Sequence, residues 1–139
     1  MTWFSDDMTT DPSGPLILVA TNRLKPGKLD AERTRVAGLA AFLEEQEPRL
    51  LAFNEYVNAD ATEVTVVQVH PDAASLQTHL GVVAESAAAA YSEILDATVA
   101  VQIYGPADPA MLDTLRGQTG PGMTLTVATD HLGGFVRTA

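Results

Sequence analysis

The chain has 139 residues, about the size of one domain, and its 46% of hydrophobic residues suffice for a buried core. Its 18 acidic residues against 8 basic ones give a formal net charge of −10, which disfavours binding to nucleic acid or to an anionic membrane. The chain contains no cysteine, so disulfides, thiolate metal sites and a cysteine nucleophile are excluded. The acidic N-terminal segment lacks the features of a signal peptide, and no apolar run approaches about 18 residues, so we expect a cytoplasmic protein.

Residues 1–14 are polar and end in a Pro-Ser-Gly turn sequence, which predicts a flexible tail. Residues 15–139 are expected to form a single domain, with a core over 16–105 and a C-terminal extension over 106–139. Within the core, apolar periodicity and turn residues predict, in chain order, a strand over 16–24, a helix over 29–46, strands over 51–58 and 63–69, a short helix from 71 to about 80, a break at Gly81, a second helical segment over about 84–95, and a strand over 98–104.

The first helix has a clear apolar face, since Val36, Leu39 and Leu43 recur at helical spacing, while Arg35 and Glu45 occupy the opposite face. The polar segment between the second and third strands indicates a hairpin. The order β-α-β-β-α-β is that of a ferredoxin-like fold. It is an α+β arrangement whose antiparallel sheet carries both helices on one face.

The C-terminal extension adds further elements. Asp108 followed by proline is typical of a helix start, and Gly117 is typical of a helix end. A strand is predicted over 124–128, and a return strand over 135–137 is possible after two glycines.

Large apolar side chains project from both faces of this predicted sheet, although helices cover one face. Leu16 and Leu18 point to one side and Ile17 and Val19 to the other. The helices are not expected to cover all of the residues Ile17, Val19, Phe53, Val99, Val101 and Ile103. We therefore predict a homodimer packed sheet against sheet. The alternative is a monomer whose C-terminal extension folds back over the second face.

Two segments carry a family resemblance. Residues 21–28 form the first strand-to-helix turn, and residues 67–80 span the third strand and the next helix. Both resemble the antibiotic biosynthesis monooxygenase (ABM) family of dimeric α+β-barrel proteins. That family commonly has a strand ending in tryptophan, a short linker, and a helix with a hydrophobic-x-x-His ending. His79 stands at the position of that histidine, and His70 stands near that of the tryptophan.

The resemblance, over about residues 16–104, implies a cofactor-independent monooxygenase that acts on a small hydrophobic aromatic or phenolic compound. It places Asn22, His70 and His79 in or near a cleft between helices and sheet. There a histidine would serve as general base and the Asn22 amide would bind a developing phenolate or enolate oxygen. The substrate-binding candidates are Tyr56, Tyr91 and Tyr104.

Each of these residues also has a structural interpretation. His79 could end its helix, His70 could stand at a strand-to-helix junction, and Asn22 could bind the adjacent turn. Tyr56 and Tyr104 could be packing residues.

Other functions remain open at this point. The fold also occurs in non-catalytic small-ligand-binding or stress-related dimers and in structural subunits, and fold does not fix function. The haem-degrading subgroup has an axial histidine where this chain has alanines 87–90. The three histidines lack the spacing of a metal site. We therefore expect no cofactor and no metal.

Overall fold

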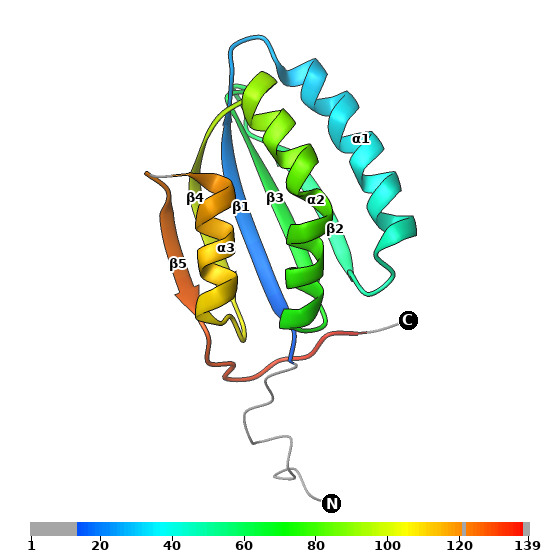
Figure 1. Ribbon diagram of the computed structural model, residues 1–139, viewed down its shortest axis with the longest axis vertical. Helices are drawn as coiled ribbons and strands as arrows, with labels where there is room; N and C mark the ends of the chain where they lie inside the picture. Colours follow the sequence, from blue (N-terminus) through cyan, green and yellow to red (C-terminus); the bar gives the residue numbers. More distant parts are fainter. Residues whose placement is uncertain (1–13, 121, 138–139) are drawn as a thin grey trace, which may run out of the picture.

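The computed structural model describes residues 14–120 and 122–137, so most of the predicted tail lies outside the described residues. Across this part of the chain, the elements in order are β1 (Leu16–Leu24), α1 (Leu29–Gln46), β2 (Ala52–Val57), β3 (Glu63–His70), α2 (Ala73–Glu93), β4 (Leu95–Tyr104), α3 (Pro109–Thr119) and β5 (Thr124–Ala128). The five strands form one sheet in the order β2-β3-β1-β4-β5, with the helices packed on one face (Figure 1). The pairs β1–β3, β1–β4 and β2–β3 are antiparallel. The predicted ferredoxin-like α+β fold is confirmed, and the sheet of this single subunit is open.

The extension joins the sheet through a parallel pair. Strand β5 runs parallel to β4, and α3 crosses between them on the helical face. Asp108 caps α3, since its Oδ1 accepts a hydrogen bond from the Met111 N–H at 2.8 Å. The helix passes its predicted end at Gly117 and stops at Thr119.

Two expectations about secondary structure are wrong. Helix α2 runs unbroken through Gly81, because a helical glycine costs only about 1 kcal/mol and its neighbours favour the helix. Residues 135–137 form no strand, and every residue from 129 to 137 is exposed. Figure 1 shows this segment passing below the end of the sheet, away from its second face.

The helical face of the sheet carries the main core. The buried cluster joins strands β1 and β4 to helices α2 and α3. It comprises Leu16, Leu18, Leu76, Leu80, Val101, Ile103, Met111 and Leu115. Val101 and Ile103 therefore lie under the helices, and so does Phe53, whose partner Gln68 is paired with Leu18. Three of the six residues that the helices were not expected to cover completely thus lie under the helices, whereas Ile17 and Val19 lie on the second face.

A change of register in β4 separates Val99 from the other apolar residues of that strand. Thr21 pairs with Ala100, whereas Asn22 pairs with Thr98, so Val99 is an extra residue in β4. Because of this extra residue, Val99 does not share the face of Val101 and Ile103. Thr98 lies on the helical face instead, where it is buried beside Asn22. The irregularity thus brings a hydroxyl to the site described below.

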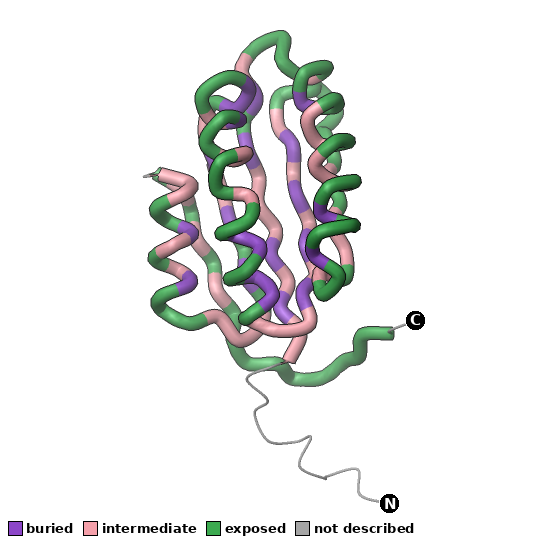
Figure 2. The backbone as a smooth tube through the Cα atoms, turned by 45° about the vertical axis from the view of Figure 1, so that its right-hand side comes forward, coloured by how far each residue is buried: buried purple, intermediate pink, exposed green. Residues whose placement is uncertain are grey.

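The second face of the sheet remains partly exposed. Ile17, Val19, Val67 and Val69 alternate with the core residues and pair across β1 and β3. All four are half-buried in the single subunit (Figure 2 shows the alternating burial along the strands). None of the helices in the described part of the chain is long and apolar enough to cross a membrane.

Candidate functional site

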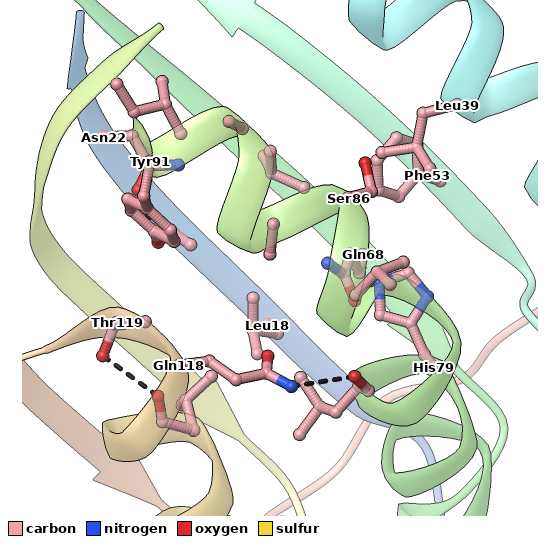
Figure 3. A pocket seen from close by; sticks show the side chains of 18 of the residues that line it. Leu18, Asn22, Leu39, Phe53, Gln68, His79, Ser86, Tyr91, Gln118 and Thr119 are labelled. Atoms are coloured by element: carbon pink, nitrogen blue, oxygen red, sulfur yellow. Dashed lines mark hydrogen bonds between the residues drawn. The ribbon is translucent and has the colours of Figure 1, made fainter. Parts of the chain in front are cut away.

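A cavity of about 110 Å³ lies between the helical face of the sheet and the three helices (Figure 3). Strands β1, β2 and β3, with Leu95 of β4, supply its floor, and helices α1, α2 and α3 supply its walls. Most of its lining is apolar. The polar residues that line it are Asn22, Arg35, Gln68, His79, Ser86, Tyr91, Gln118 and Thr119.

His79 lines the cavity from the middle of α2, so the alternative in which it ends its helix is wrong. Its Nδ1 lies 2.9 Å from Oε2 of Glu47, the buried residue that follows α1. A carboxylate at this position accepts the Nδ1–H and thereby selects one tautomer. Among the described residues, none forms a hydrogen bond with Nε2. The lone pair of Nε2 is therefore available to a ligand.

Burial lowers the pKa of His79, and the charge and hydrogen bond of Glu47 oppose that shift. The net direction is downward, so the imidazole is neutral at neutral pH. A neutral histidine with Nδ1 held by a carboxylate is the arrangement of a general base.

His70 is completely buried but does not line the cavity. Its Nε2 lies 2.9 Å from Oε1 of Gln68, and its Nδ1 lies 2.8 Å from Oγ of Ser75. Burial, and next the charge of His79, lower the pKa of His70 to about 4, against a raising effect of Asp72. With both nitrogens engaged, His70 fits the role of a positioning residue that orients the Gln68 amide in the cavity wall.

The opposite end of the cavity holds a second polar group. Oδ1 of Asn22 accepts hydrogen bonds from Oγ1 of Thr98 at 2.5 Å and from the Tyr91 hydroxyl at 3.3 Å. The Tyr91 hydroxyl is also hydrogen-bonded to Thr98. Asn22 thus binds side chains, not the adjacent turn, and its amide nitrogen has no acceptor among the described residues. Figure 3 shows Asn22 and Tyr91 together, away from His79.

The two polar ends are too far apart to act on one atom. His79 lies beside His70, which is hydrogen-bonded to Gln68. Gln68 in turn pairs with Leu18, and Asn22 lies four residues farther along β1. At about 3.3 Å per residue, the separation along the strand is about 13 Å. His79 and Asn22 would therefore contact different parts of a ligand.

Arg35 lines the cavity from α1, where the sequence pattern had placed it on the outer face of the helix. It donates two hydrogen bonds to Glu32, at 2.7 and 2.8 Å. Glu32 is 1% exposed. The paired charges let both side chains turn inward.

Tyr91 is the one predicted substrate-binding tyrosine that lines this cavity. Tyr56 and Tyr104 lie on the second face of the sheet, since Tyr56 pairs with Thr65 and Tyr104 with Ile17. No pattern in the sequence indicates a role for Glu47, Gln68, Thr98 or Gln118. Glu47 lies 32 residues from His79 along the chain, and no local pattern connects them.

Comparisons with known proteins identify the fold. No family model matches the chain, and no curated protein matches it. Among solved structures, MupZ from Pseudomonas fluorescens is similar over 89% of this chain and 95% of its own, with 22% identity and a TM-score of 0.66. Rv0793 from Mycobacterium tuberculosis is similar over 70% of this chain and 99% of its own, with 22% identity and a TM-score of 0.57.

A third neighbour carries a functional name. It is a protein from Bacteroides thetaiotaomicron that is provisionally named an antibiotic biosynthesis monooxygenase. The similarity covers 63% of this chain and 86% of that one, with 14% identity and a TM-score of 0.50. The chain therefore has an ABM-like fold, a ferredoxin-like α+β subunit with an added helix and strand.

Proposed function

We propose that the cavity binds a small aromatic phenol and that the chain is a cofactor-independent monooxygenase. The observation that carries this proposal is the His79–Glu47 pair, with Nδ1 of His79 held at 2.9 Å and Nε2 unpartnered among the described residues. Nε2 takes the phenolic proton, and the resulting electron-rich anion reduces dioxygen directly. The ABM name of one structural neighbour supports the same reaction class.

The reaction balances with dioxygen as the co-reactant. For a hydroquinone, addition of O₂ to the anion forms a carbon–oxygen bond, and loss of water from the hydroperoxide breaks the oxygen–oxygen bond. One oxygen atom enters the ring and the other leaves as water. The organic product is a hydroxyquinone, so the ring is oxidised and dioxygen is reduced without another electron donor.

The size of the cavity restricts the substrate. Its volume of about 110 Å³ is below the roughly 150 Å³ of an engineered cavity that accepts benzene. A single ring is therefore favoured over a fused polycyclic system. The phenolic oxygen would lie at His79, with the apolar residues Leu18, Val66 and Phe53 around the ring and a substituent directed toward Asn22.

Oxygen uptake with monocyclic hydroquinones, followed by mass spectrometry after reaction under ¹⁸O₂, tests this function. We expect one ¹⁸O atom in the product and one in water. His79→Ala should lower turnover by about 100-fold or more, as expected for loss of a general base. His131→Ala changes an exposed histidine outside the cavity and is the matched control.

Turnover that survives His79→Ala would contradict the role of this residue. Saturable binding of the same hydroquinones without oxygen uptake would instead assign the cavity to a non-catalytic ligand-binding protein.

We further propose that the second face of the sheet packs against the same face of a second copy. The support is the apolar group Ile17, Val19, Val67 and Val69, which pair across β1 and β3 on this face and are only half-buried in the single subunit. Burying such side chains stabilises a complex by roughly 1.5 kcal/mol or more for each one that becomes fully buried. Sedimentation analysis over a range of concentrations tests the proposal, and a monomer at all concentrations would contradict it.

A further inference from the structure

A second cavity lies on the other side of Glu47. Its volume is about 190 Å³, and its lining comprises Gln46, Glu47, Pro48, Arg49, Ser75 and Thr78. Gln46, Pro48, Arg49 and Thr78 are exposed, so this cavity is in contact with solvent. His79 does not line it, and Glu47 does not line the first cavity.

The Glu47–His79 pair therefore stands between the two cavities. The side chains are 4% and 2% exposed, and their contact is the 2.9 Å hydrogen bond between Oε2 and Nδ1. Both partners can carry a proton, and a hydrogen bond of this length is a short path for proton transfer. Each partner also faces a different space.

We infer that the Glu47–His79 pair conducts protons between the first cavity and solvent in the second cavity. The inference rests on the proposed function of His79 as the base. A proton accepted at Nε2 gives an imidazolium, which passes its Nδ1 proton to Oε2 of Glu47. The Glu47 carboxyl group then releases that proton to water in the second cavity.

Over one full cycle the pathway returns His79 to its starting protonation state, so the pair neither gains nor loses a proton. After the first transfer, His79 carries its proton on Nε2, where it can protonate the reduced oxygen. A proton returning from Glu47 to Nδ1 restores the starting tautomer. The pathway thus lets protons leave and return without crossing the space that a substrate would occupy in the first cavity.

The other charged and titratable groups near the pair are engaged with partners of their own. Arg49 lines the second cavity and forms an ion pair with Asp72, the residue that caps α2. The His70 ring centre lies 5.6 Å from that of His79, and both nitrogens of His70 are engaged. Glu47 is thus the acceptor that directly contacts His79.

Solvent exchange of the His79 Nδ1 proton tests the pathway without any substrate. It can be measured by NMR on protein labelled with ¹⁵N in histidine. Glu47→Gln keeps an oxygen that accepts the Nδ1–H but cannot take up the proton. We expect this variant to retain the Nδ1–H tautomer while exchange slows by at least about tenfold. Exchange as fast as in the wild type would overturn the inference.

Two matched variants identify the route independently of any change at Glu47. Thr78→Phe narrows the second cavity, and Ser86→Phe narrows the first. The pathway predicts slower exchange in Thr78→Phe and unchanged exchange in Ser86→Phe. The reverse result would show that protons enter through the first cavity, and would overturn the inference.

Turnover provides a separate measurement. If the wild type oxidises a hydroquinone, Glu47→Ala should lose activity and regain part of it when formate, a small carboxylate, is added. If the wild type oxidises none, the proposed function fails, but the exchange measurements still decide whether the pathway exists.

Discussion

Arg35 holds Glu32, one helical turn away on α1, through two parallel hydrogen bonds of 2.7 and 2.8 Å. Glu55 of β2 lies near the same pair, and its Oε1 is buried without a hydrogen-bond partner in the described part of the chain. Two carboxyl groups thus lie near one guanidinium, and only Glu32 is hydrogen-bonded to it. Burial, and then the neighbouring Glu32, raise the pKa of Glu55 to about 8, while Arg35 opposes the shift. Glu55 is therefore protonated at neutral pH.

This proton makes the stability of the fold depend on pH. The pKa of Glu55 rises from an ordinary 4.5 to about 8 in the folded state, so the folded chain holds a proton that the unfolded chain has released. The contribution to the free energy of unfolding is therefore lost as the pH rises through this window. Glu55→Gln should remove the decline between about pH 4.5 and 8 and exceed the wild type in Tm above pH 8. Parallel pH profiles of Tm would contradict the assignment.

His70 should destabilise the protein in acid. Its pKa falls from 6.5 to about 4, chiefly through burial, so the unfolded chain takes up a proton before the folded chain does. The stability contributed by neutral His70 is complete above pH 6.5 and declines as the pH falls toward 4. NMR titration of the ring protons should give a midpoint near 4. A midpoint near 6.5 would show that the ring is accessible to solvent.

The sequence predicted the framework of the fold better than the site. The bounds of β1, α1 and β5 follow from local patterns of apolar and turn residues, and the structure confirms them. The Glu47–His79 contact joins the residue that follows α1 to α2, 32 residues farther along the chain, and the Asn22–Thr98 contact depends on the register shift at Val99. Neither leaves a local signal, because each joins residues that are distant in the chain.

Gly105 is expected to tolerate no side chain. Its φ is +121°, and a Cβ there would lie 2.5 Å from the carbonyl oxygen of Pro15. Gly105→Ala should lower the free energy of unfolding by about 2 kcal/mol or more, measured by urea denaturation. Gly38, in the middle of α1, has nothing within 4 Å of its Cβ position. Gly38→Ala should stabilise the protein by about 0.5–1 kcal/mol, and equal losses in both variants would contradict this explanation.

Thr98 is expected to hold the polar end of the first cavity together. Thr98→Val keeps the shape of the side chain but removes the hydroxyl that contacts both Asn22 and Tyr91. We expect a loss of about 1–2 kcal/mol in the free energy of unfolding. Tyr91→Phe should cost about 1 kcal/mol. The double variant should cost less than the sum, since the residues share one network. Strict additivity would show that the three groups act independently.

Dimerisation through the second face should depend on its centre. Val67 pairs with Val19, and both belong to the half-buried apolar group of that face. Val67→Asp would place a charge in the proposed interface, so sedimentation should shift from dimer to monomer while circular dichroism stays unchanged. Phe42→Asp introduces the same charge at a side chain on α1 that is 48% exposed, and this control should remain dimeric. If Phe42→Asp instead gives the monomer, the subunits associate through their helices and the second face is free.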